Sequence, residues 1–117
     1  MKSQTLKENK DFRRLYYRGK SKAGDALVTY AMKNREGALR YGITTSKKIG
    51  NAVQRNRARR VIRAAFSEIE EKVSGSWDFV FVARTRTSRV KTQVIKKQME
   101  KQFKELGVIN EKNKPSS

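Results

Sequence analysis

Apolar residues recur at three- and four-residue steps in three segments of the chain, which is the spacing of one buried helix face. The pattern predicts helices over residues 9–17, 51–72 and 92–106. Asn9, Asn51 and Thr92 are suitable N-caps for them. Each segment is followed by a glycine, the residue that most often ends a helix. The side chains expected in the core from the two longer helices are Ala58, Val61, Ile62, Ala65, Phe66, Ile69, Val73, Ile95, Met99, Phe103 and Leu106.

Two short segments alternate between their two faces, as strands do. These are residues 26–32 and 39–45, and a turn-forming stretch at 34–37 separates them, so the pattern predicts a hairpin. Residues 77–83 are almost wholly apolar, which is typical of a strand covered on both faces. We expect this third segment to insert beside residues 39–45.

The predicted elements indicate an α+β fold, a single two-layer sandwich with a small mixed sheet and helices packed on it. The expected order is α-β-β-β-α-β-α. We expect one domain over residues 1–109, followed by a polar, disordered tail at 110–117 that contains the only proline. The aromatic residues expected in the core are Phe66, Trp77, Phe79, Phe81 and Phe103.

The charge of the chain narrows the possible functions. Its 117 residues include 29 Lys or Arg against 11 Asp or Glu, a formal net charge of +18. Cysteine and histidine are both absent, which excludes disulfides, cysteine-based zinc sites and histidine acid–base catalysis. A metal-dependent nuclease needs converging carboxylates, but residues 37–67 contain no acid at all. The composition therefore predicts a polyanion-binding module whose chemistry, if any, comes from a partner.

Nothing in the sequence indicates a membrane partner. The chain has no apolar run of about 18 residues, the length that spans a bilayer. Its start carries charge but no apolar segment behind it, so we expect no secretory signal. These features predict a cytoplasmic protein.

The most informative stretch is KKIGNAVQRNRARRVIR, residues 47–63. On a helix, Asn56, Arg59, Arg60 and Arg63 form one stripe opposite the apolar face. Planar guanidinium groups bind phosphate with two parallel hydrogen bonds. A solvated charged surface is the alternative, but such surfaces normally mix signs, and this one does not.

Aromatic residues suggest a second surface. Phe12 and Tyr16 share a helix face, and Tyr30 lies on the strand expected beneath it. The cations that flank these rings are Arg13, Arg14, Arg18 and Lys33. Exposed rings among cations form a stacking platform for unpaired bases. Aromatic residues at helix and strand spacing are also common in cores, and the pattern alone leaves both interpretations open.

The stretch 47–63 strongly resembles the signature of the bacterial ribonuclease P protein component. The similarity extends to Asn9–Phe12, Gly19, Tyr30, Tyr41-Gly42 and Ala83-Arg84, and it covers roughly residues 5–106. The resemblance implies a ribonucleoprotein endonuclease in which a large RNA is the catalyst. The complex hydrolyses one phosphodiester and so removes the 5′ leader of precursor tRNA. It also implies a left-handed crossover between parallel strands, against the general rule.

The resemblance further implies which residues contact RNA, and it implies no catalytic or metal-binding residue in the protein. Mg²⁺ would be bound mainly by the RNA partner. The partners would be the catalytic RNA and precursor tRNA, with one protein per RNA or a dimer of holoenzymes. The residues implied to face the catalytic RNA are Lys47, Lys48, Asn51, Arg55, Asn56, Arg57, Arg59, Arg60 and Arg63, and those implied to form the leader cleft are Phe12, Arg13, Tyr16 and Tyr30.

Two other functions remain compatible with the residue pattern. One is a basic ribosomal or RNA-packaging protein without leader specificity. The other is a DNA-binding regulator that reads the major groove with the helix at 51–72. Readers of that kind usually bind as dimers, and the sequence shows no dimerisation segment.

Overall fold

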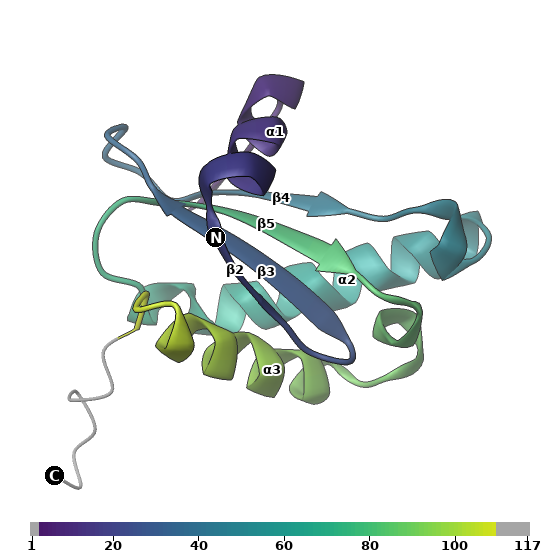
Figure 1. The fold of residues 1–117 in the computed structure, drawn as a ribbon. Coiled ribbons are helices and arrows are strands. Elements are labelled where there is room, and N and C mark those ends of the chain that lie inside the picture. Colours follow the sequence, from purple (N-terminus) through teal and green to yellow (C-terminus); the bar gives the residue numbers. More distant parts are fainter. Residues whose placement is uncertain (1–2, 110–117) are drawn as a thin grey trace, which may run out of the picture.

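A computed structural model describes residues 3–109 of the protein (Figure 1). The strands are β1 (Gln4–Thr5), β2 (Lys20–Ala23), β3 (Leu27–Lys33), β4 (Arg40–Thr44) and β5 (Trp77–Ala83). The α-helices are α1 (Asn9–Arg18), α2 (Ala52–Ile69) and α3 (Thr92–Glu105). Three short 3₁₀ helices complete the chain: η1 (Lys47–Ile49), η2 (Glu70–Lys72) and η3 (Thr85–Arg89).

The strands form one mixed sheet in the order β1-β4-β5-β3-β2. β3 runs antiparallel to β2 and β5, whereas β4 runs parallel to β5 and β1. The prediction that residues 77–83 insert beside 39–45 is therefore confirmed. The predicted hairpin of residues 26–32 and 39–45 is wrong, because β5 lies between β3 and β4 and pairs with both. In Figure 1 the chain leaves β4, passes behind the sheet as α2 and returns in β5, so the crossover is left-handed, as the resemblance implied.

Helices cover the two faces of the sheet unequally. α2 and α3 lie side by side on one face, and the shorter α1 lies on the other (Figure 1). The main core lies under α2 and α3, where the Phe79 and Phe103 rings stack with centroids 4.7 Å apart. All five aromatic residues predicted for the core are in it. The predicted apolar stripe of α2 is also buried throughout. Of the apolar residues predicted for the last helix, Ile95, Met99 and Phe103 are buried, and Leu106, which directly follows α3, is partly exposed.

The structure adds to the predicted element order at its beginning. The two-residue strand β1 precedes α1 and pairs with β4. No prediction included it, because two residues carry no periodicity. The third strand before α2 is β2, which the apolar pattern did not locate because all four of its residues (KSKA) are exposed. Its lysines lie on the free edge of the sheet, where charge discourages pairing with other chains.

The start of α2 follows the sequence prediction. The Asn51 Oδ1 accepts a hydrogen bond from the Gln54 N–H at 3.0 Å, and the Gln54 Oε1 accepts one from the Asn51 N–H at 2.9 Å. This reciprocal capping box satisfies two backbone donors that a helix start leaves without partners. The local sequence therefore determines where this long basic helix begins.

Other helix ends differ from the prediction. Asn9 and Thr92 are the first residues of their helices, not N-caps, and the cap positions are Glu8 and Lys91, neither with a side-chain cap bond. α2 ends at Ile69, and residues 70–72 form η2. The predicted tail at 110–117 lies outside the described residues. No helix within residues 3–109 has the length and apolar character needed to cross a bilayer.

Candidate nucleic-acid interface

The nine residues predicted to face a catalytic RNA lie together on η1 and α2. The apolar side of α2 packs on the sheet, which turns the opposite side to solvent. All nine are exposed except Arg55, which is half-buried. We call this surface the arginine face; it consists of Lys47, Lys48, Asn51, Arg55, Asn56, Arg57, Arg59, Arg60 and Arg63.

Three of the arginines are held in place by neutral oxygens. Arg55 donates to the Gly50 carbonyl at 2.8 Å and Arg57 to the Ser88 carbonyl, also at 2.8 Å. Arg59 donates to the Thr45 hydroxyl at 2.9 Å. Such bonds orient a guanidinium without cancelling its charge. The ion pairs found within residues 3–109 include no arginine of α2, so the arginine face keeps its full positive charge.

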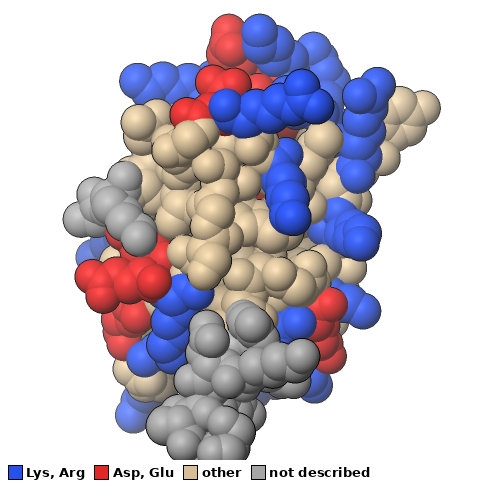
Figure 2. Space-filling model, turned by 90° about the vertical axis from the view of Figure 1, so that its left-hand side faces the viewer, with Lys and Arg blue, Asp and Glu red and all other residues tan. Residues whose placement is uncertain are grey.

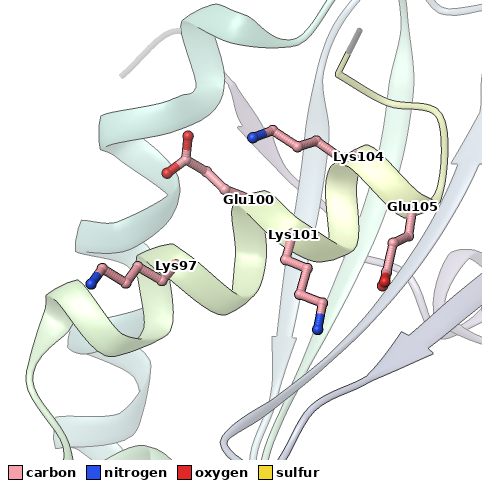
Figure 3. Close-up of a pocket in the computed structure, with 5 residues that line it drawn as sticks. All are labelled: Lys97, Glu100, Lys101, Lys104 and Glu105. Carbon is pink, nitrogen blue, oxygen red and sulfur yellow. The ribbon is translucent and has the colours of Figure 1, made fainter. Parts of the chain in front are cut away.

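The exposed side of α3 differs from this face. Three lysines and two glutamates of α3 line a hollow of 530 Å³: Lys97, Glu100, Lys101, Lys104 and Glu105. Figure 3 shows these side chains projecting to different sides of the helix. Lys96 pairs with Glu68 at 3.2 Å, and Lys72 pairs with Glu100 at 2.7 Å. The hydrogen bond from Lys72 lowers the pKa of the Glu100 carboxyl below its ordinary value. Mixed, paired charges of this kind match the solvated surface expected of a helix that binds no polyanion.

The three aromatic residues predicted for the leader cleft also come together, on the sheet face that α1 covers, and Arg13 follows Phe12 on α1. The Tyr16 and Tyr30 rings meet edge to face with centroids 5.0 Å apart, and the Tyr16 hydroxyl lies 2.7 Å from the Thr44 Oγ1. Tyr16 is 41% exposed and Arg13 is exposed, so both are available to a ligand. We call Phe12, Arg13, Tyr16 and Tyr30 the aromatic patch.

The interpretation of these rings as core residues is partly right. Phe12 and Tyr30 are half-buried and pack against the small apolar cluster of Leu6, Leu15 and Val80 beneath α1. The rings therefore have one side in the protein and one side toward solvent. A half-buried ring is held rigidly, and its free side can still stack on a base.

A glycine allows the Phe12 ring to lie close to the sheet. A Cβ atom at Gly42 would be only 2.4 Å from the Phe12 Cζ, well inside contact distance. Any other residue at position 42 would push the ring away from β4. Gly42, which belongs to the Tyr41-Gly42 pair of the family resemblance, thus leaves the space that the Phe12 ring of the aromatic patch occupies.

Asp78 fixes α1 to the sheet, a role that the apolar pattern of residues 77–83 did not indicate. Its side chain is buried and accepts two hydrogen bonds from Arg40, both 2.8 Å, and one from Asn34 at 2.7 Å. Arg14 of α1 donates to the same carboxylate at 3.0 Å. The bond to Asp78 raises the pKa of Arg40 above its ordinary value. The sequence does contain a signal for this role: Asp78 is the only acid in the apolar run 77–83, and a buried carboxylate requires cationic partners.

We expect Arg14→Met to lower the free energy of unfolding by about 1–2 kcal/mol, because it removes one of two cations from a buried carboxylate. Lys10→Met is the matched control: it removes one positive charge from the same helix, but the Lys10–Glu8 pair is exposed at both ends. Urea unfolding followed by circular dichroism measures both variants. Equal stability losses would show that the Arg14–Asp78 contact does not anchor α1.

The arginine face and the aromatic patch meet at one cavity of 220 Å³. Phe12 of the aromatic patch lines it together with Arg59 and Arg63 of the arginine face. Residues from distant parts of the chain therefore join the arginine face to the aromatic patch at Phe12. The remaining residues that line this cavity are Thr5, Leu6, Tyr41, Gly42 and Ile43.

Sequence comparison relates this arrangement to a known family. The family model described as Ribonuclease P matches residues 1–107. A ribonuclease P protein component from Clostridioides difficile is 48% identical over 80 residues, which cover 68% of this chain and 70% of that protein. One from Pelotomaculum thermopropionicum is 43% identical over 99 residues, covering 85% and 88% of the two chains.

Solved structures agree with the sequence comparison. The ribonuclease P protein of Staphylococcus aureus superposes with a TM-score of 0.80 at 35% identity, covering 93% of this chain and all (100%) of that one. The ribonuclease P protein of Thermotoga maritima gives a TM-score of 0.73 at 25% identity, with 84% and 93% covered. The α+β prediction is thus confirmed by solved structures of this kind. This chain belongs to the ribonuclease P protein family.

Proposed function

We propose that this chain is the RNA-binding protein subunit of a ribonuclease P ribonucleoprotein. The arginine face binds the catalytic RNA through its phosphates. The aromatic patch binds the single-stranded 5′ leader of precursor tRNA. The RNA partner carries out the hydrolysis that gives the mature 5′ end, and the complex works in the cytoplasm.

The observation that carries this proposal is the cavity shared by Phe12, Arg59 and Arg63. Folded RNA presents phosphates to a protein, whereas a single strand also presents unpaired bases. Uncompensated guanidinium groups suit the first ligand, and half-buried rings suit the second. A surface that joins the two can hold a structured RNA and a single strand next to each other.

The same surface does not fit a protein-borne metal site. Within residues 3–109, no three acidic side chains cluster in a way that could hold a metal ion. Asp78 is buried and already bonded to Arg14, Arg40 and Asn34. We therefore propose that Mg²⁺ is held mainly by RNA phosphates and assign no catalytic residue to this chain. Its own residues bind and orient the two RNAs.

Reconstitution tests the proposal. The purified chain is mixed with a ribonuclease P RNA and precursor tRNA at moderate Mg²⁺, with RNA alone and protein alone as references. We expect faster cleavage and tighter precursor binding than with RNA alone, and no cleavage by the protein alone. The absence of any gain would favour an RNA-packaging protein. Light scattering of the assembled complex distinguishes one chain per RNA from a dimer of holoenzymes.

A further inference from the structure

A second cavity lies away from both surfaces described above. It measures 370 Å³ and lies where β3 ends and β5 begins, next to the last residue of α1 and the end of α3. Ligand sites in proteins usually measure about 300–1,000 Å³. Its lining residues are Arg18, Lys20, Ala31, Met32, Lys33, Trp77, Leu106 and Gly107.

The cavity combines an uncharged floor with a cationic rim. None of its lining side chains is acidic. Arg18, Lys20 and Lys33 take no part in the ion pairs found within residues 3–109. Figure 2 shows this end of the molecule as a broad uncharged surface with Lys, Arg, Asp and Glu side chains around it. The acidic side chains do not line the cavity itself. Charge complementarity therefore favours an anionic ligand that also has an apolar part.

Trp77 gives the floor a fixed aromatic group. Its Nε1 donates to the Ser74 carbonyl at 3.0 Å, and its ring lies nearly parallel to that of Phe79, 8° between the planes. The Lys33 Nζ lies 5.7 Å from the centre of the Trp77 ring, a cation–π contact. The indole is only 9% exposed, so a ligand in the cavity meets its exposed edge, with the Lys33 ammonium over the ring and Arg18 and Lys20 nearby. An aromatic edge next to cations can contact a base together with its phosphate.

We propose that this cavity binds one nucleotide of single-stranded RNA, with its base against Trp77 and Met32 and its phosphate between Arg18, Lys20 and Lys33. The inference extends the proposed RNA-binding role and is separate from the leader contact. Phe12 lies near the start of α1 and Arg18 is its last residue, so the two sites lie toward opposite ends of that helix. The chain thus has a second contact for unpaired RNA.

The only tryptophan of the chain makes the test direct, since Trp77 is the single source of tryptophan fluorescence. The full chain is titrated with a short oligouridylate, and emission is excited where tyrosine does not absorb. We expect saturable quenching. Lys20→Met and Lys33→Met should each raise the oligouridylate concentration at half-maximal quenching about fivefold to tenfold, because each removes a phosphate contact.

Lys22→Met is the matched control, because Lys22 is an exposed lysine of the same strand that does not line the cavity. Its midpoint should equal that of the unaltered chain, and circular dichroism confirms that all variants fold. Absent quenching, or equal shifts in all three variants, would overturn the inference.

Tyr16→Ala separates this inference from the proposed function. It should leave the Trp77 quenching unchanged, because the Tyr16 ring belongs to the aromatic patch. If quenching is absent while the holoenzyme still prefers precursor over mature tRNA, the cavity inference fails and the proposed function stands. If quenching occurs but reconstitution gives no gain in cleavage, the proposed function fails instead.

Discussion

Replacement of Arg59, Arg60 and Arg63 by alanine is expected to weaken binding to the ribonuclease P RNA by about 10³-fold. Each of these exposed guanidinium groups retains its charge, and a hydrogen bond to a charged partner contributes roughly 1.5–3 kcal/mol. The three contacts share one RNA surface, so their losses should not add fully. A filter-binding or mobility-shift titration at fixed salt measures the change in Kd.

The matched control removes the same charge from another helix. This control is a triple alanine variant of α3 at Lys96, Lys101 and Lys104. It also lowers the net charge by three, but on a surface where acidic residues lie between the lysines. We expect less than a fivefold loss from this variant, since screening makes distant surface charges weak contributors. Equal losses in the two triple variants would mean that only total charge matters, which would contradict the assignment of the arginine face.

Salt dependence gives the same prediction a second readout. If the unaltered chain makes about 6–10 phosphate contacts, its affinity should drop about 10³–10⁵-fold between 50 and 200 mM salt. The loss of three contacts should reduce the slope of log K against log salt by about 2–3. A flat salt response of the unaltered chain would rule out phosphate contacts as the main source of binding.

Tyr16→Ala is expected to weaken binding of precursor tRNA to the holoenzyme by about 5–100-fold, with binding of mature tRNA unchanged. Tyr16 is the most exposed ring of the aromatic patch, at 41%, and a stacked base contributes roughly 1–3 kcal/mol. Mature tRNA has no leader and so makes no contact to lose. The ratio of the two dissociation constants, measured with the same holoenzyme preparation, isolates the leader contact.

Two variants control for this interpretation. Tyr16→Phe keeps the ring but removes the hydroxyl that lies 2.7 Å from Thr44, and it should cost less than about threefold if stacking dominates. Tyr17→Ala removes the neighbouring ring, which is 92% exposed and outside the aromatic patch. It should bind precursor as the unaltered chain does. Equal weakening of precursor and mature tRNA by Tyr16→Ala would indicate a purely structural ring.

The aromatic patch depends on contacts from three separate parts of the chain. Asp78 of β5 binds Arg14 of α1 and so fixes the helix that carries Phe12 and Tyr16. Gly42 of β4 leaves room for the Phe12 ring. Because these contacts do not involve RNA, the patch is formed before a ligand arrives. A preorganised site binds with less loss of conformational freedom than one that must be ordered on binding.

Local patterns along the sequence were enough to predict the elements with strong periodicity. The buried stripe of α2 follows from three- and four-residue spacing, and the capping box at Asn51 follows from residue types next to each other in the chain. The same spacing places the arginines on the opposite side. The sequence has no cysteine or histidine, and residues 37–67 contain no acid. These absences excluded disulfides, cysteine-based zinc sites and histidine catalysis without reference to the structure. These properties depend on near neighbours, which one sequence shows directly.

Contacts between distant residues were decided only by the tertiary structure. β1 is too short, and β2 too polar, to be seen in an apolar pattern, and both exist because neighbouring strands supply hydrogen-bond partners. Asp78 meets Arg14 across 64 positions of sequence, and Phe12 meets Arg59 at one cavity. Local periodicity specifies which side of an element is buried. The sheet order and the packing of α1 across it specify which residues then meet, and the joined surface arises from that packing.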